Sequence, residues 1–515
     1  MEPPLAPPKV PLIGHLWGMF RHGGGYYKLL CSKYGCCWPL FSIQIFSTEI
    51  YVVNSPELAQ AIFRDTKALS FNPFVIEFTR RVMKARDHVM NVISVNDGEN
   101  DHFDSIHHVT QRSFAHVPAV LETNQRVLNG LARYLNGVDT SGQFVQLFDW
   151  IRNAYTVVTA EALYGNVNPI SEDPKLVKNI WDFEGGVMTL SLNLFPRLTA
   201  PAAWKARKAL VPAFIDYYNR GLDQYANSWI KSRAQIGRQD GFTNKDLGSF
   251  ELTVLYTSIV NTVPNAFSML CRILREPALT AKICHEVDSI IGRFNQADGT
   301  VRVSLNIADI VKQCPILVST WQENIRFTVN ATSVRVVMED VVIKDKYLLK
   351  KGGIVQICGG AIHESTRYWG QDALTFDPYR FLENKDQSRG VKKARSQGLL
   401  PFGGGKHLCP GRNLAFVEVV SFLAMLVVGF DIRMKDGSLV QPPPYKKQYV
   451  GEASKKPEHD IEVKITRKEA YKDAVFEFWV ESSVEVEESS MAEPGNDDPF
   501  QGQQPNFEGL GFSLH

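Results

Sequence analysis

Apolar side chains recur at helical spacing along most of this chain. The spacing predicts helices over residues 101–135 and over most of 145–295. Strand-like alternation is limited to short stretches at residues 41–46, 50–53 and 461–466. We therefore expect a mainly α protein with a small β portion. Short breaks in the helical pattern fall at residues 166–174, 196–201, 237–248 and 294–299.

Two apolar helices stand out in this pattern. The first is predicted over residues 251–274 and has Pro264 in its interior, where proline removes a backbone hydrogen bond and bends a helix. The second is predicted to begin at Arg412, directly after a glycine-rich loop. The first helix is thus expected to be locally broken, and the second to follow a sharp turn.

The loop before the second helix carries the candidate chemistry. Gly403, Gly404 and Gly405 allow tight turns, and Cys409 stands just before the helix N-terminus. The helix dipole and free backbone N–H groups there are expected to lower the pKa of the thiol. The thiolate could be a nucleophile, a metal ligand or a haem axial ligand. A plain glycine turn that holds a buried cysteine is an equally open alternative.

Composition narrows the class of protein. The 515 residues are 44% hydrophobic and 22% charged, and the net charge of +1 suggests no polyanionic partner such as nucleic acid. The eight cysteines form no CxxC pair and no regular framework, which argues against structural zinc and a secreted disulfide scaffold. We expect a reducing compartment.

The two ends of the chain differ from the body. Residues 1–20 form a proline-rich, hinge-like lead-in, and we expect neither a signal peptide nor an anchor before it. No run of about 18 uncharged apolar residues predicts a transmembrane helix. Residues 481–515 are acidic, contain no Lys or Arg, and are expected to be disordered.

The loop spacing is that of a known family. Phe402-x-x-Gly405-x-His407-x-Cys409-x-Gly411 resembles the haem-binding loop of the cytochrome P450 family. The resemblance implies the P450 fold, a haem (iron protoporphyrin IX) cofactor, and Cys409 as the proximal ligand of the iron. It places His407 at a haem propionate and makes Phe402 and Gly405 part of the cofactor-binding loop.

Four further elements are compared with the same family. Glu323-x-x-Arg326 and Arg380 resemble the ExxR and PxRF elements, which imply a buried structural triad behind the cysteine loop. Arg335 stands where the family has a haem-propionate ligand. Arg112, in a segment with His108 where the family usually has Trp, is implied to bind the other propionate.

The broken helix departs from the family pattern. Where most members have an acid and a threonine, this chain has Val260 and Asn261. Asn261-Thr262-Val-Pro264 resembles the subgroup that contains sterol 7α-hydroxylases and prostacyclin synthase. Val260 cannot relay a proton, so Asn261 and Thr262 are the candidate catalytic residues on this side of the haem.

The resemblance implies one P450 domain over residues 21–480. It implies a haem-thiolate monooxygenase that oxidises a small lipophilic metabolite, of secondary metabolism or of sterol or terpenoid type. Electrons would come from a separate NADPH-cytochrome P450 reductase, since no flavin or nucleotide motif is present. The expected location is intracellular and associated with the endoplasmic reticulum membrane, by peripheral contact.

Other functions remain open at this point. The Val260-Asn261 departure also suits an isomerase or dehydratase that acts on an already oxidised substrate without external electrons. A non-catalytic haem protein and a cysteine-nucleophile enzyme are weaker alternatives. A metal site on a helix is the weakest, because the histidine cluster lacks an acidic partner at a suitable spacing. That cluster comprises His102, His107, His108 and His116.

Overall fold

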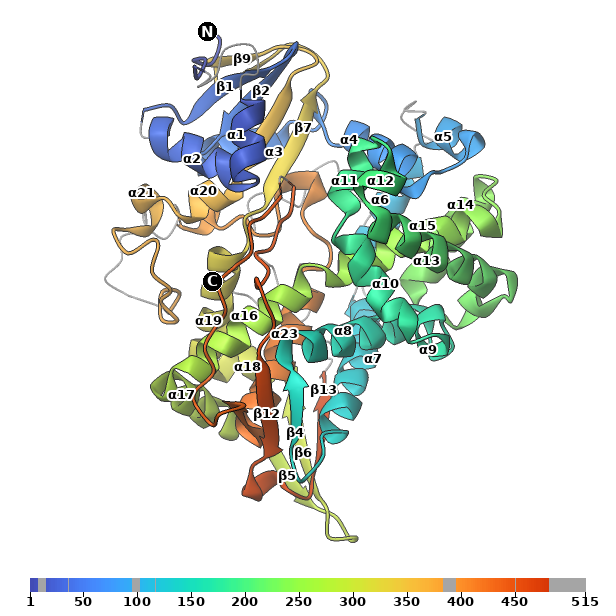
Figure 1. The fold of residues 1–515 in the computed structure, drawn as a ribbon, viewed down its shortest axis with the longest axis vertical. Helices are drawn as coiled ribbons and strands as arrows, with labels where there is room; N and C mark the ends of the chain where they lie inside the picture. The colour runs from blue at the N-terminus through green and yellow to red at the C-terminus, as the bar shows by residue number, and fades with distance from the viewer. Residues whose placement is uncertain are drawn as a thin grey trace, which may run out of the picture.

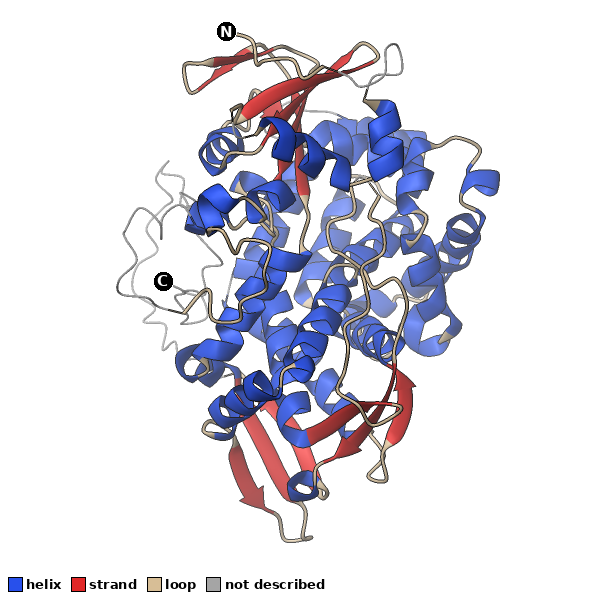
Figure 2. Ribbon diagram, turned by 60° about the vertical axis from the view of Figure 1, so that its left-hand side comes forward, coloured by secondary structure: helices blue, strands red, loops and turns tan. Residues whose placement is uncertain are grey.

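Helices fill the middle of the molecule and strands lie toward its two ends (Figure 1, Figure 2). The structure is a computed structural model that describes residues 1–7, 15–35, 37–94, 102–115, 117–382, 395–449 and 451–480. The expected mainly α fold with a small β portion is confirmed. The predicted tail, residues 481–515, and part of the lead-in, residues 8–14, lie outside the described residues.

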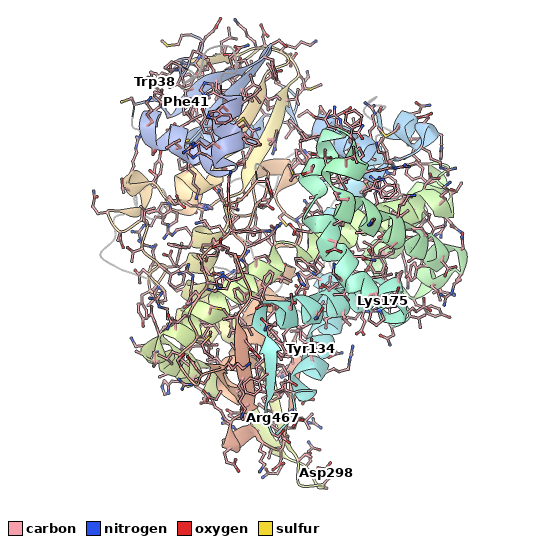
Figure 3. All side chains as sticks on the ribbon, viewed as in Figure 1. Trp38, Phe41, Tyr134, Lys175, Asp298 and Arg467 are labelled. Carbon is pink, nitrogen blue, oxygen red and sulfur yellow. The ribbon has the colours of Figure 1, made fainter. Side chains whose placement is uncertain are left out.

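The larger sheet lies at the end of the molecule that holds the N-terminus (Figure 1). Its strand order is β1-β2-β10-β7-β3, and β2 and β10 are parallel neighbours although they are far apart in the sequence. Figure 3 labels Phe41 in this portion, where its ring is fully buried. The strands are β1 Leu40–Ile45, β2 Thr48–Val53, β3 Leu69–Ser70, β7 Thr332–Val337 and β10 Ile354–Cys358, so the strands predicted near residues 41–46 and 50–53 are confirmed.

Two three-stranded sheets lie at the opposite end, with Asp298 at the tip in Figure 3. One is β11-β12-β4, formed by Phe430–Met434, Glu462–Arg467 and Gln143–Gln146. The other is β13-β6-β5, formed by Ala474–Trp479, Val301–Asn306 and Gly292–Asn295. The strand predicted over residues 461–466 is therefore confirmed. A separate hairpin pairs β8 Val341–Ile343 with β9 Tyr347–Leu349.

Helix α23, Arg412–Gly429, runs through the core of the helical body. It packs against α7 Val117–Asn136, α16 Thr262–Arg275, α17 Pro277–Asp288 and α19 Pro315–Thr328. These contacts surround the helix, which explains why it is apolar on every side. Within the described residues, one segment has the length and hydropathy of a membrane span. It is Gly405–Gly429, and 83% of its apolar window is buried inside the protein.

The helix predicted over residues 251–274 is two helices. α15, Asn244–Ile259, ends before Val260, and α16 begins at Thr262. Pro264 therefore lies in the first turn of α16 and not in a helix interior. Because Pro264 has no N–H, the carbonyl of Val260 lacks its partner four residues on, and the chain breaks at Val260 and Asn261.

The remaining helices complete the body. In the N-terminal third, the single helix predicted over residues 101–135 is represented by two helices, α6 and α7, and a π-helical turn occupies Thr79–Met83. The other helices are α1 Leu16–His22, α2 Gly25–Tyr34, α3 Pro56–Arg64, α4 Asn72–Phe78, α5 Asp87–Ser94, α6 His102–Ala115, α8 Leu147–Tyr164, α9 Pro169–Glu172, α10 Lys175–Glu184, α11 Val187–Leu192, α12 Pro196–Thr199, α13 Pro201–Asn219, α14 Ser228–Gln239, α18 Ile307–Gln313, α20 Gly359–His363 and α21 Thr366–Trp369.

Candidate active site

A cavity of about 440 Å³ lies where α15, α16, α19 and β7 meet the loop that precedes α23. Its size is within the range of small-molecule sites. Six of the candidate side chains singled out in the sequence line it, namely Asn261, Thr262, Arg335, Phe402, His407 and Cys409. The structure therefore brings together side chains from three segments that are distant in sequence.

The cysteine loop takes its shape from close packing on α3. Gly405 has φ +62°, and a Cβ there would lie 2.3 Å from the carbonyl oxygen of Phe63. A Cβ on Gly404 would lie 2.4 Å from the Phe63 ring. The backbone N–H of Cys409 donates a hydrogen bond to the carbonyl of Phe402 at 3.0 Å. Only glycine fits at these two positions, and the closed loop presents Cys409 to the cavity.

The expected low pKa of Cys409 is not what the protein alone produces. Burial raises the pKa of the Cys409 thiol, and the backbone N–H of Gly411 and the charge of Arg412 oppose this only in part. The helix N-terminus is thus outweighed by the loss of water around the sulfur. A metal cation bound to the sulfur would favour the thiolate.

A buried cation without a counter-charge lies at another side of the cavity. Arg335 is 4% exposed, and its one hydrogen bond among the described residues goes to the carbonyl of its neighbour Val334, at 2.7 Å. It forms no ion pair with any carboxylate in that part of the chain, and burial lowers its pKa to about 10. His407 also lines the cavity, and burial and the charge of Arg335 lower its pKa to about 3.

This chemistry fits a haem group. A carboxylate-bearing ligand would supply the missing partner for Arg335, since a buried guanidinium is stable only when it is paired. A thiol sulfur on the same cavity is a suitable iron ligand. The cavity thus offers one sulfur donor and one anion-binding side chain to the same small molecule.

The structure does not bring Arg112 to this cavity. Arg112 lies on α6 with an exposed side chain. Another residue of α6, His107, takes the position beside the loop, with its ring centroid 5.6 Å from that of His407. Burial and the charge of Lys406 lower the pKa of His107. The histidine cluster could be seen in the sequence, but only the packing of α6 on the loop shows that His107 is the member that lies beside His407.

The metal hypothesis for that cluster has no support in the described residues. No group of three His, Cys, Asp or Glu side chains in that part of the chain could hold a metal ion. His102 instead pairs with Asp240 at 2.5 Å, and His116 lies outside the described residues.

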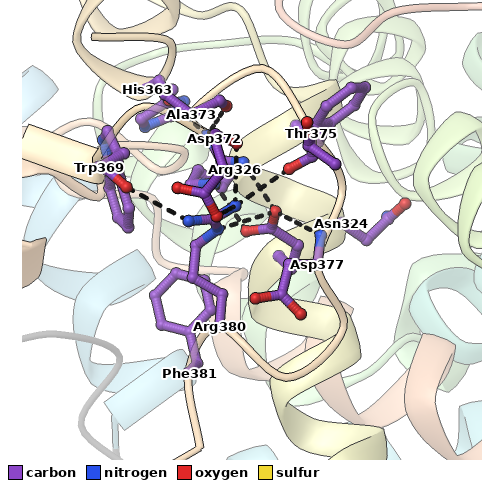
Figure 4. Close-up of polar contacts among 12 residues, drawn as sticks. Asn324, Arg326, His363, Trp369, Asp372, Ala373, Thr375, Asp377, Arg380 and Phe381 are labelled. Carbon is purple, nitrogen blue, oxygen red and sulfur yellow. Dashed lines mark hydrogen bonds and ion pairs between the residues drawn. The ribbon is translucent and has the colours of Figure 1, made fainter. Parts of the chain in front are cut away.

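The three residues expected to form a buried triad contact one another, and Figure 4 shows Arg326 and Arg380 side by side among their polar contacts. Arg326 donates to both carboxylate oxygens of Glu323 at 2.7 Å, and Arg380 donates to one of them at 3.1 Å. Glu323 is 0% exposed. The remaining donors of Arg326 reach the carbonyls of Ala373 and His363. The charges are therefore buried with most of their hydrogen bonds satisfied.

His363 connects this triad to the cysteine loop. Its Nδ1 lies 3.1 Å from the carbonyl of Val329, and its Nε2 accepts the backbone N–H of Leu400 at 2.9 Å. The accepting nitrogen requires a neutral ring, and burial lowers the pKa of His363 to about 3. Sequence reasoning missed this residue, because its partners come from two distant segments.

The α15–α16 break supplies the cavity wall. The Asn261 amide is exposed to the cavity and has no hydrogen-bond partner among the described residues, and the Thr262 hydroxyl donates to the carbonyl of Ser258 at 3.4 Å. Asn265 fixes the break by donating to the Asn261 carbonyl at 2.7 Å and to Ser454 Oγ at 3.1 Å.

An acid that the sequence did not suggest also lines the cavity. Glu418 of α23 is 2% exposed, and its Oε1 has no hydrogen-bond partner. Burial raises its pKa to about 8, so the side chain is largely neutral at pH 7. Its position two turns into an apolar helix gave no sequence signal, because a single Glu in such a pattern is equally consistent with an exposed face.

Three features of this mainly helical fold together define the haem-thiolate class of proteins. They are a cavity-facing cysteine on a glycine loop, a buried Glu–Arg–Arg triad, and a buried arginine that has no carboxylate partner in the described part of the chain. The sequence model of cytochrome P450 matches residues 3–462. The chain belongs to the cytochrome P450 family, whose members bind haem.

Curated relatives agree along almost the whole chain. A cytochrome P450 monooxygenase of Gibberella zeae is 32% identical over 91% of this chain and 88% of its own length. Cytochrome P450 monooxygenase nodJ of Hypoxylon pulicicidum is 27% identical over 93% of this chain and 92% of its own. A rabbit 7-alpha-hydroxycholest-4-en-3-one 12-alpha-hydroxylase is 23% identical over 91% and 93%. The chain is thus a haem-containing oxidoreductase whose general activity is that of a monooxygenase.

Proposed function

We propose that this enzyme inserts one oxygen atom into a small lipophilic metabolite, of secondary metabolism or of sterol or terpenoid type, with electrons from NADPH-cytochrome P450 reductase. The proposal rests on the cavity that presents to one ligand both Cys409 and Arg335, which has no carboxylate partner among the described residues. In this role Cys409 holds the haem iron, while Arg335 and His407 bind propionates. Phe402 and Gly405 shape the loop, and His107 takes the place expected for Arg112.

The likeness to the sterol 7α-hydroxylase and prostacyclin synthase subgroup belongs to this proposal. It is supported by Asn261-x-x-Pro264 and by relatives near 23% identity that are named 12-alpha-hydroxylases. The triad of Glu323, Arg326 and Arg380 has a structural role here, because none of the three lines the cavity.

Haem supplies the activation of dioxygen when it is bound. The chain's own residues then bind and orient. The Asn261 amide can hydrogen-bond an oxygen atom in the cavity, and the Thr262 hydroxyl can turn from the Ser258 carbonyl, because that bond is long at 3.4 Å. Val260 is buried and cannot carry a proton. We assign Asn261 and Thr262 to proton and oxygen positioning on this wall.

Turnover with purified reductase tests the proposal. The monooxygenase consumes NADPH and dioxygen and incorporates one oxygen atom in the product. Asn261 favours a second candidate, a P450-fold isomerase or dehydratase, because an amide is a poor acid. Product formation from an oxidised precursor without NADPH or reductase would establish that second candidate and exclude the monooxygenase.

We also propose peripheral contact with the endoplasmic reticulum membrane. Exposed apolar side chains gather on α1, at Trp17 and Phe20, and around α12, at Phe195 and Leu198. Lys447 and Gly451 lie between these segments, since Lys447 donates to the Phe20 carbonyl and a Cβ on Gly451 would meet Met188 of α11. Co-sedimentation with lipid vesicles should be lost when Phe20, Phe195 and Leu198 are changed to Ser; unchanged sedimentation would contradict this contact.

A further inference from the structure

Two kinds of side chain line the cavity wall at one place: polar side chains come from one helix, and aromatic side chains come from two others. The polar part is a row of oxygens on α15, formed by Thr257 and Ser258. The aromatic part is Phe114 of α6 and Trp229 of α14. We infer that the substrate is a rigid polycyclic molecule with a hydroxyl or N–H donor: the rings pack on Trp229 and Phe114, and the donor binds the Thr257–Ser258 oxygens. This inference rests on the proposed function and specifies its substrate class.

The two hydroxyls of the row are already committed as donors. Thr257 Oγ1 donates to the carbonyl of Thr253 at 2.9 Å, and Ser258 Oγ donates to that of Val254 at 2.8 Å. A hydroxyl has one proton, so each oxygen can offer only lone pairs to the cavity. The row therefore accepts hydrogen bonds and does not give them. A ligand that lies on it needs a donor of its own.

The aromatic wall is apolar in chemistry as well as in shape. The indole N–H of Trp229 donates to Thr110 Oγ1 at 3.0 Å, so it is not available to a ligand. The Trp229 ring meets Phe114 edge to face, with centroids 4.9 Å apart. Together the two rings offer a large hydrophobic surface without a free polar atom.

Charged and hydroxyl side chains outside the cavity hold the Trp229 ring in place. The Arg233 guanidinium lies 5.3 Å from the centroid of the Trp229 ring and is itself bound to Glu251 at 3.2 Å. Glu251 is 2% exposed and also accepts the hydroxyls of Tyr164 and Tyr218, each at 3.0 Å. A support with this many buried hydrogen bonds resists movement of the indole.

An aromatic wall that cannot move favours a ligand that is conformationally rigid. A rigid ring system loses little conformational freedom when it packs on Trp229, whereas a flexible chain must be ordered at a cost for each rotatable bond. A ring system without a donor would leave the Thr257 and Ser258 lone pairs buried and unsatisfied, which is how polar sites reject analogues. The two parts of the wall thus select together for ring rigidity and for a donor.

The binding of matched probes to haem-loaded full-length protein tests the inferred substrate class. Androstanol and tetrahydrocarbazole are rigid and carry a donor; the O-methyl ether and the N-methyl derivative lack it, and dodecanol is flexible. We expect each donor probe to bind at least tenfold more tightly than its methylated partner and than dodecanol, measured by titration of the Soret absorption shift.

Substitutions on α15 test whether the Thr257 and Ser258 oxygens cause the preference for ligands with a hydrogen-bond donor. Thr257→Val with Ser258→Ala should abolish the donor preference, and Thr257→Ser should keep it. Ser249→Ala is the matched control, because Ser249 makes the same bond to a carbonyl one turn back, at 2.7 Å, at a position of α15 that is not part of the cavity lining. Trp229→Ala should remove the advantage of the ring probes over dodecanol.

Three results would overturn the inference: methylated and donor probes that bind equally, a preference that survives the double substitution, or no response to either donor probe. Each is scored only in protein whose reduced form with carbon monoxide shows the red-shifted Soret band. Absence of that band would instead contradict the haem-thiolate function itself, so the two failures are distinguishable.

Discussion

Several side chains that line the cavity lack ion-pair or hydrogen-bond partners in the described part of the chain, and these missing partners determine the chemistry of the cavity. Arg335 lacks a carboxylate, Asn261 lacks a hydrogen-bond partner, and Glu418 lacks a partner for one oxygen, all within the described residues. Buried polar groups are normally satisfied, so the gaps at Arg335 and Glu418 mark places where a ligand or water completes the site, whereas the Asn261 amide is exposed to the cavity. His363 is the opposite case, because both of its ring nitrogens are satisfied.

His363 should make stability depend on pH. Its pKa is about 3 in the folded protein against 6.5 for a free histidine. Its contribution is complete above pH 6.5 and is lost as the pH falls toward the folded value, because the unfolded chain takes up the proton first. Urea unfolding at several pH values should show the loss, at most ~1.4 kcal/mol per pH unit for this group.

A His363→Phe variant separates this group from the rest. It should be less stable at neutral pH by ~1–3 kcal/mol, because the Leu400 N–H and the Val329 carbonyl lose their partner. Its stability should also fall less steeply with acid than that of the natural protein. Parallel pH curves for the two proteins would contradict the role of His363.

Single residues also show what could be predicted from the sequence. Cys409, His407 and Phe402 were predicted to share a site because they lie in one short motif, and the structure does place them on one cavity. His107, His363 and Glu418 were not singled out for the site. Their roles depend on which distant segment packs against them, and one sequence does not contain that information.

Contacts between helices and loops determine how these side chains are oriented. The triad ties α19 to the segment that carries Arg380, and His363 passes this rigidity to Leu400 at the start of the cysteine loop. That these segments meet was implied by the family resemblance, because Glu323-x-x-Arg326 and Arg380 match its ExxR and PxRF elements. The helix break was expected nearer Pro264, but it falls at Val260 and Asn261, because proline removes the bond to the residue four positions before it.

Breaking the triad should be severe. Glu323→Ala leaves two buried guanidinium groups without their shared carboxylate, and we expect a loss of ~3–5 kcal/mol in the free energy of unfolding. Chemical denaturation followed by circular dichroism measures it. Asp182→Ala is the control: its pair with Lys178 is an exposed i,i+4 contact, so the change should stay within ~0.5 kcal/mol. Equal effects of the two substitutions would contradict the structural role.

Pro264→Ala tests the position of the break. Proline is tolerated in a first helical turn but costs ~3 kcal/mol in a helix interior. With Pro264 in the first turn of α16, the substitution should change stability by less than ~1 kcal/mol. A gain near ~3 kcal/mol in denaturation would show that α15 and α16 form one strained helix.

The described part of the chain is a helical body with strands toward its two ends (Figure 2), and the cavity that Cys409 lines is formed by helices, β7 and the cysteine loop. The mainly α fold was predictable, because helical spacing extends over most of the chain and the strands have short alternating runs. How the segments surround the cavity was not predictable from spacing alone; it came from the family resemblance. That resemblance covers the sequence motifs, and the packing then shows which side chains reach the cavity.

The central claim is that Cys409 holds a haem iron. The most direct measurement is the absorption spectrum of the reduced, haem-loaded protein with carbon monoxide. We predict the red-shifted Soret band of thiolate ligation, its loss in Cys409→Ser, and its retention in Cys37→Ser, which changes an exposed cysteine elsewhere. A folded, haem-loaded protein without that band, or a Cys409→Ser variant that keeps it, would contradict the account.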